Sequence, residues 1–143
     1  MADNKVRTWD AKQLIVVFGA IKFTGFAEGT IVAIERNGEA FEKVRGADGG
    51  IDRVNKNAND FQITVTLKQT SPTNDLLTTA LIADQAGNLG VFPIAIKDLG
   101  GTTLFASTQA WISKDPDDDF SDSMGSREWV FDTGVGAKIT GSN

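Results

Sequence analysis

The chain has 143 residues, 41% of them hydrophobic, which is typical of one folded domain with a core of its own. It contains no cysteine and no histidine, which excludes disulfides, thiolate nucleophiles, the usual zinc sites and imidazole acid–base catalysis. The net charge is −5 and the cations are dispersed, so we expect no tight binding of DNA.

No apolar run reaches the roughly 18 residues that a membrane span needs. The polar start Met1–Lys5 lacks a signal-peptide pattern, so we expect synthesis in a cytoplasm without export directed by a signal peptide.

Short apolar alternations separated by glycine-containing turns predict a mainly β fold with one α-helix. The strands predicted in the first third of the chain cover residues 13–18, 20–26, 30–36 and 40–45. Asn37-Gly38 predicts a hairpin turn between the last two, because both residues tolerate positive φ. The connection 46–59 that follows has no clear period, and loops of that length are typically functional or disordered.

The clearest strand covers residues 61–67. Its apolar side chains, Phe61, Ile63, Val65 and Leu67, fall on one face, and Gln62, Thr64 and Thr66 fall on the other. Later strands are predicted over 91–97, 103–113 and 128–133. Pro93 indicates an edge or a bulge, since proline cannot donate a ladder hydrogen bond.

A single helix is predicted over residues 72–85. Ser71 supplies a capping hydroxyl, Pro72 fits the first helical position, and Gly87 supplies a stop. The apolar stripe of this helix consists of Leu76, Leu77, Ala80, Leu81 and Ala83. We predict one domain over 1–143, with residues 140–143 as a loose tail.

A colinear series of short phrases covers residues 9 to about 133. They are Trp9-Asp10-Ala11-Lys12, Gly25-Phe26-Ala27-Glu28-Gly29-Thr30, Glu35-Arg36-Asn37, Phe41-Glu42-Lys43-Val44-Arg45-Gly46-Ala47-Asp48-Gly49, Thr64-Val65-Thr66-Leu67, Gln69-Thr70-Ser71-Pro72-Thr73-Asn74-Asp75, Lys97-Asp98-Leu99, Ala110-Trp111-Ile112-Ser113-Lys114 and Arg127-Glu128-Trp129-Val130. In this order they resemble the tail-tube proteins of contractile-tailed bacteriophages, which are related to the tubes of bacterial injection systems.

The resemblance implies a rolled β-sandwich or β-barrel flanked by a helix, in a virion structural protein that is not an enzyme and needs no cofactor. It also implies six-membered rings that stack helically around a channel through which DNA passes without specific binding. The partners it implies are further copies of the chain, the sheath, the baseplate or tube initiator, a tape-measure protein and a tail terminator. Open sheet edges, which proteins normally protect, would be used in closing such a ring.

The connection 46–59 is the candidate for an arm that reaches a neighbouring subunit or ring. Its candidate interface residues are Asp48, Gly49, Ile51, Asp52, Arg53 and Val54. In this interpretation Ile51 and Val54 are buried against the neighbour and the ions lie at the rim. The alternative is an unattached surface loop.

The candidate lumen face consists of Gln62, Thr64 and Thr66, extended by Ser107 and Gln109. Short uncharged side chains meet water without holding phosphate. The alternative is the ordinary solvent face of a strand.

Other motifs support no chemistry. The acidic run 115–122 lacks the glycine and glutamate of a calcium-binding EF-hand loop, which favours a solvated loop. Asp48-Gly49-Gly50 and Gly134-Val135-Gly136 lack the context of a phosphate loop and predict turns. Trp9, Trp111 and Trp129 are read as core or interface aromatics, and Glu28, Glu35 and Asp98 have no catalytic spacing.

Two other functions stay open. The first is the tube of a contractile injection machine or a phage-derived bacteriocin, which shares the assembly but carries no DNA. The second is a soluble β-sandwich module of the virion, a decoration or baseplate protein.

Overall fold

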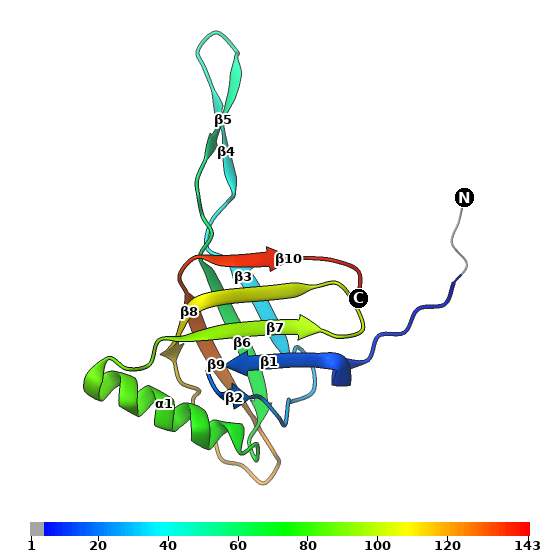
Figure 1. Ribbon diagram of the computed structural model, residues 1–143, viewed down its shortest axis with the longest axis vertical. Helices are drawn as coiled ribbons and strands as arrows, with labels where there is room; N and C mark the ends of the chain where they lie inside the picture. Colours follow the sequence, from blue (N-terminus) through cyan, green and yellow to red (C-terminus); the bar gives the residue numbers. More distant parts are fainter. Residues whose placement is uncertain (1–4) are drawn as a thin grey trace.

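The computed structural model describes residues 5–143, so Met1–Asn4 of the polar start lie outside the described part. A short 3-10 helix covers Ala11–Gln13, and one α-helix, α1, covers Thr73–Gly87 (Figure 1). The strands are β1 (Leu14–Phe18), β2 (Ile21–Lys22), β3 (Val32–Arg36), β4 (Phe41–Arg45), β5 (Ile51–Asn55), β6 (Phe61–Lys68), β7 (Phe92–Asp98), β8 (Leu104–Lys114), β9 (Ser126–Thr133) and β10 (Gly136–Ile139). The predicted mainly β fold with one helix is confirmed.

One eight-stranded sheet rolls over on itself to make a two-layered sandwich. Its strand order is β2-β1-β7-β8-β9-β6-β3, and β10 pairs with β8 as well. The long strand β8 belongs to both layers, because its first half pairs with β7 and β10 and its second half with β9. The register shift between β7 and β8 lies between Ser107 and Ala110, where β8 passes from one layer to the other, as expected of a bulge that bends a sheet. Pro93 lies at this shift, which confirms its predicted role.

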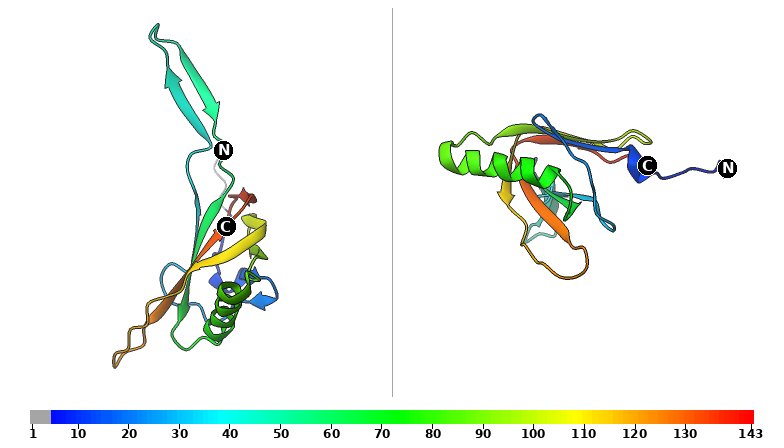
Figure 2. Two further views of the ribbon diagram at one scale, coloured as in Figure 1. Left: turned by 90° about the vertical axis from the view of Figure 1, so that its left-hand side faces the viewer. Right: turned by 90° about the horizontal axis from the view of Figure 1, so that it is seen from below.

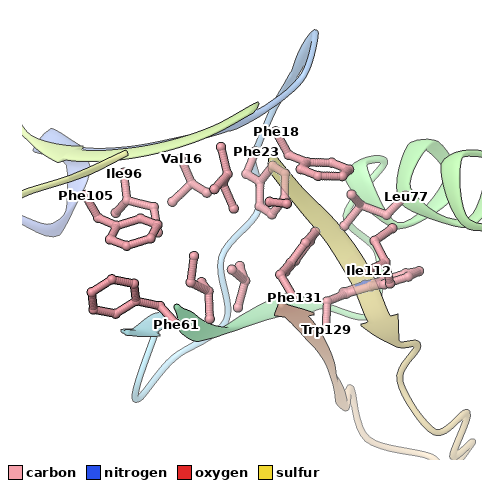
Figure 3. Packing of buried hydrophobic residues seen from close by; sticks show 14 of the residues in the cluster. Val16, Phe18, Phe23, Phe61, Leu77, Ile96, Phe105, Ile112, Trp129 and Phe131 are labelled. Carbon is pink, nitrogen blue, oxygen red and sulfur yellow. The ribbon is translucent and has the colours of Figure 1, made fainter. Parts of the chain in front are cut away.

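The core lies between the two layers (Figure 3). The predicted alternation of β6 is confirmed, since Phe61, Ile63, Val65 and Leu67 are all fully buried. Aromatic rings from both layers meet edge to face: the Phe131 ring lies 5.1 Å from that of Phe18.

Removing the Phe131 ring from this cluster should destabilise the folded domain strongly. Phe131→Ala is expected to lower the free energy of unfolding by about 3–5 kcal/mol, because it leaves a cavity between layers that cannot collapse. Phe120→Ala is the matched control: this side chain is 78% exposed, so we expect a loss of about 1 kcal/mol or less. Urea unfolding followed by tryptophan fluorescence measures both values, and equal losses would contradict the packing described here.

The helix α1 covers one end of the sandwich (Figure 1). The helix begins at Thr73, one residue after the predicted start, with Pro72 as its N-cap; the Thr73 N–H donates to the Ser71 hydroxyl (3.3 Å), which itself donates to the Thr24 carbonyl (2.6 Å). It ends at Gly87, two residues after the predicted Gln85, and Asn88 rather than Gly87 supplies the left-handed cap (φ 56°). Of the predicted stripe, Leu77, Ala80 and Leu81 pack on the core, whereas Leu76 and Ala83 are exposed.

The structure corrects three predictions about connections. Asn37-Gly38 is not a hairpin turn, because β3 pairs with β6 while β4 pairs with β5. The strand predicted over 20–26 is reduced to Ile21–Lys22; Gly25, with φ 70°, turns the chain where a Cβ would clash with Ser71. Gly134 and Val135 connect β9 to β10 as a bend, but Gly136 begins β10, a strand that the sequence pattern does not predict.

The final residues are tied to the sandwich by hydrogen bonds. The Thr102 N–H donates to the Ser142 carbonyl, and the Ser142 N–H donates to the Thr102 hydroxyl, both at 2.9 Å. The Gly141 N–H donates to the Thr103 hydroxyl at 3.1 Å. Residues 140–143 are therefore held at the β7–β8 turn, in contrast to the loose tail expected from composition.

Candidate assembly surfaces

Residues 41–55 form a two-stranded hairpin that projects from one end of the domain (Figures 1 and 2). We call it the arm hairpin. Its strands are β4 and β5, so the segment 46–59 predicted as a loop contains the second strand of the hairpin. The stem below it is anchored: the Arg36 guanidinium donates to Asn59 Oδ1 (3.1 Å) and to the Ala58 carbonyl, and the Lys56 N–H donates to the Ala40 carbonyl (3.0 Å).

The tip of the arm hairpin contains two of the predicted interface residues. The Gly46 N–H donates to the Gly50 carbonyl (2.8 Å), and Asp48 Oδ1 accepts from the Gly50 N–H (2.9 Å). Gly49 adopts φ 86°, which a side chain would strain. Asp48 and Gly49 therefore shape the turn, a role the sequence analysis had also given to Asp48-Gly49-Gly50.

Every residue of β4 and β5 is exposed. Four of them are large apolar side chains: Phe41 is 45% exposed, Val44 44%, Ile51 58% and Val54 47%. An isolated two-stranded hairpin is marginally stable in water, and this one has no layer of its own chain against it. The arm hairpin therefore has the composition of a surface that another molecule covers.

The pairing register places the predicted arm residues on opposite faces of the hairpin. Arg53 pairs with Lys43 and Ile51 with Arg45, whereas Val54 pairs with Glu42 and Asp52 with Val44. Directly paired residues share a face, and successive residues alternate. Ile51 and Val54 thus lie on opposite faces of the hairpin, so both faces must be covered if the two side chains are to be buried as predicted.

Gln62, Thr64 and Thr66 lie on the outer face of β6, where they are half-buried. On one side β6 pairs with β3, which contributes Ala33 and Glu35 to the same face. On the other side it pairs with β9, which contributes the side chains Glu128, Val130 and Asp132. The result is a polar, acidic sheet surface about three strands wide.

Ser107 does not extend this surface. It is buried, and its hydroxyl donates to the carbonyls of Gln109 (3.2 Å) and Val135 (3.0 Å). Gln109 is exposed at the bend of β8. Ser107 points inward with Phe105 by the ordinary alternation of the strand, whereas Gln109 is exposed beside Thr108 because the bulge interrupts that alternation.

The acidic run forms a loop at the end of the molecule opposite the arm hairpin (Figure 2). We call residues 115–122 the acidic loop. It is held by Arg127, whose side chain is buried on β9: Nε lies 3.3 Å from Asp118 Oδ1, and the guanidinium donates to the Asp119 carbonyl (3.4 Å) and stacks on Phe120 (5.5 Å). The loop is thus ordered around a buried cation.

Free sheet edges are a further feature of the described residues. The strand order ends at β2 and at β3, and β3 pairs with β6 alone. Exposed edges present unpaired backbone groups that can pair with another chain.

Within residues 5–143 nothing indicates catalysis. No group of three or more Asp or Glu could hold a metal ion there. A hollow of about 540 Å³ over β1, β7, β8 and β10 is lined by small and apolar residues without an acid or a base. Asp98 is buried and accepts from the Gly100 N–H (2.9 Å), while Glu35 lies in the other layer. Of the helices described, none is long and apolar enough to cross a membrane.

The tryptophans take different positions. The Trp129 indole is buried and donates to Asn74 Oδ1 (2.9 Å), joining β9 to α1. Trp111 is half-buried on the outer face of β8, and Trp9 is 55% exposed.

The described residues form a rolled sandwich with open edges and a projecting hairpin, surfaces typical of a subunit that assembles with other molecules. The model of the bacteriophage PhiTE tail tube protein family matches residues 18–141, so the chain belongs to that family of tail-tube structural proteins of the virion. It is also similar to structural protein ORF10 of Pseudomonas phage KPP10, with 39% identity over 114 residues. That alignment covers 75% of this chain and 63% of the relative, so the chain spans under two thirds of the relative's length.

Solved structures share the fold at low identity. A chain of the tube-terminating cap of the anti-feeding prophage has a TM-score of 0.64 at 15% identity, over 97% of this chain and 96% of that one. A chain of the sheath–tube complex of the extracellular contractile injection system PVC has a TM-score of 0.61 at 15% identity, over 91% of each chain. A chain of the gene transfer agent virion has a TM-score of 0.64 at 11% identity, over 93% of this chain and 100% of that one.

Proposed function

We propose that this chain assembles into closed, six-membered rings that stack into a hollow tail tube through which DNA passes during ejection. The observation that carries the proposal is the arm hairpin: ten exposed strand residues, with four large apolar side chains, held on an anchored stem. Such an element gains stability only when a neighbouring molecule covers it. The free edge of β3 provides a second, lateral means of joining copies around the ring.

The outer face of β6 supports the lumen role. Gln62, Thr64 and Thr66 carry no charge, and the carboxylates nearby on β3 and β9 are Glu35, Glu128 and Asp132. Phosphates are attracted by Lys and Arg and repelled by carboxylates, so this surface would let DNA slide without holding it. We therefore assign this face to the channel.

The partners follow from the same assembly. Tubes of the fold neighbours occur in complexes with a sheath and with a terminating cap. We propose that this tube is likewise surrounded by a sheath and closed by a terminator, starts on a baseplate or initiator, and encloses a tape-measure protein during assembly.

Electron microscopy of the purified protein tests the proposal. Negative-stain images over a rising concentration series are expected to show hollow tubes of uniform diameter with a stain-filled channel, and antibodies to the chain should label the shaft of intact virions. Single particles at the highest soluble concentration, together with unlabelled shafts, would contradict it and favour a decoration or baseplate module.

A further inference from the structure

The arm hairpin divides its charges between its two faces. Its pairing register puts Lys43, Arg45 and Arg53 on one face together with Phe41 and Ile51, and the Arg53 guanidinium stacks on the Phe41 ring (4.4 Å). We call this the basic face.

The opposite face of the hairpin is different. It carries Glu42 and Asp52 with Val44 and Val54, and Glu42 pairs with Lys56 at 3.1 Å. A hairpin with three cations on one face and two carboxylates on the other is matched to two different neighbours, because each face attracts a surface of opposite charge.

An acidic hollow lies at the other end of the molecule. It has a volume of about 370 Å³ and lies between the acidic loop, β9 and the first turns of α1. Asp75, Asp115 and Asp118 contribute carboxylates to its lining, and Phe120 and Trp129 contribute rings. Arg127 also lines the pocket and pairs with Asp118, so the lining keeps an excess of two carboxylates over cations. We call it the acidic pocket. Its loop wall is held in place by Arg127, so the pocket exists before any partner arrives.

The two surfaces lie at opposite ends of the long axis, the arm hairpin at one end and the acidic loop at the other (Figures 1 and 2). When identical copies stack along that axis, the hairpin end of one copy meets the loop end of the next. A contact of this kind joins two different patches and repeats without limit, as a tube requires.

We propose that the basic face of the arm hairpin docks on the acidic loop and acidic pocket of a second copy of this chain in the adjacent ring. The inference rests on the ring stacking proposed above and identifies the surface that receives the arm. Arg53 and Lys43 supply charge to the carboxylates, and Phe41 and Ile51 meet the ring of Phe120. Aromatic and arginine side chains that enter a concave site are typical anchors of interfaces.

This contact makes assembly depend on salt. Attraction between exposed charges is screened as the Debye length falls from about 10 Å at 0.1 M to about 3 Å at 1 M ionic strength. The critical concentration for tube formation, measured by sedimentation, is therefore expected to rise between these two conditions.

Charge reversal tests the pairing. Lys43→Glu with Arg53→Glu is expected to raise the critical concentration about tenfold or more at low salt, because like charges would then face each other. Asp115→Lys with Asp117→Lys should have the same effect; both carboxylates are exposed, and neither is the partner of Arg127. Combining all four substitutions in one chain should restore assembly to within about threefold of the unmodified protein, since the attraction is rebuilt with opposite signs.

A matched control separates the effect of where the new lysines lie from the effect of the restored net charge. Glu28→Lys with Thr79→Lys and Gln85→Lys changes three exposed residues outside the acidic pocket, β3 and the arm hairpin, and adding this set to the reversed hairpin restores net charge without restoring the contact. We expect no recovery, and circular dichroism should show all variants folded. Recovery in the control, or normal assembly of the reversed hairpin, overturns the proposal while tube formation by the unmodified protein stands. Failure of the unmodified protein to form tubes overturns the proposed function itself.

Discussion

Replacing residues 41–55 with an Asn–Gly turn is expected to abolish tube formation and to leave the domain folded. The two ends of the excised segment are already adjacent, since the Lys56 N–H donates to the Ala40 carbonyl (3.0 Å), so a short turn can close the gap. No residue of β4 or β5 belongs to the core, and the anchored stem at Arg36 is retained. The sandwich therefore loses none of its buried contacts.

The size of the effect follows from the apolar side chains that the arm hairpin exposes. Burying one such side chain fully contributes about 1.5–3 kcal/mol, and four are present, each about half-exposed. Losing even 2.8 kcal/mol corresponds to about a hundredfold weaker association. We expect the critical concentration to rise at least about a hundredfold, which in practice leaves single particles.

Sedimentation and negative-stain microscopy measure this loss, and thermal unfolding checks the fold. Ala47→Ser is the control, because it changes an exposed residue at the hairpin tip without altering either strand. The control should form tubes as the unmodified protein does. Tubes from the excised variant, equal in length and number, would show that the arm hairpin does not join the copies.

The sandwich could be predicted from the sequence because its strands are buried on one face. In β6 the period of two is imposed by the core, which requires an apolar residue at every second position from Phe61 to Leu67. The start of α1 was predictable for a similar reason, since Ser71 and Pro72 have local roles that do not depend on the rest of the fold.

The arm hairpin was harder to predict because no core imposes a pattern on it. All ten strand residues are exposed, so β5 shows no alternation with a buried face and its sequence predicts a loop. The nearby pair Asn37-Gly38 then predicted the wrong hairpin, because Val32 and Ile34 direct β3 to the core and to β6. The resemblance implies an arm, and the length of the connection 46–59 places it here; β5 of the projecting hairpin lies within this segment.

The division of charge on the hairpin depends on register, which the sequence does not show. Ile51 and Val54 are three residues apart, a spacing that places them on opposite faces of a strand but leaves their relation undefined in a loop. The sequence predicts a solvated loop for the acidic run, but it does not identify the buried anchor Arg127, because the pairing of β8 with β9 determines where the loop returns.

Thr64→Lys with Thr66→Lys is expected to leave tubes intact but to block DNA passage. Both threonines lie on the outer face of the middle strand β6, away from the free edge of β3 and from the arm hairpin. Long lysine stems can lie along the sheet with the ammonium groups in water, so the fold should lose only about 1 kcal/mol or less. If this face lines the channel, each subunit then presents two new cations to the passing phosphates.

Infectivity should fall because the two lysines are repeated in every subunit along the tube. A phosphate that meets a lysine releases counterions and is held, and every further contact multiplies the affinity. Because the same two cations recur in every copy, DNA would be held along the whole channel, and we expect infectivity to fall at least about tenfold while ejection stalls with DNA inside the tail. Plaque titre and the fraction of virions with filled tails measure this effect.

Two control variants keep lysine off this face. Virions with Thr64→Ser and Thr66→Ser keep the face uncharged and should eject DNA normally. Thr79→Lys adds a cation on α1, where the residue is exposed and away from this face, and it should also leave ejection unchanged. Normal infectivity of virions that carry the double lysine variant would place this face outside the channel, because uniform binding of DNA along a channel wall must slow its exit.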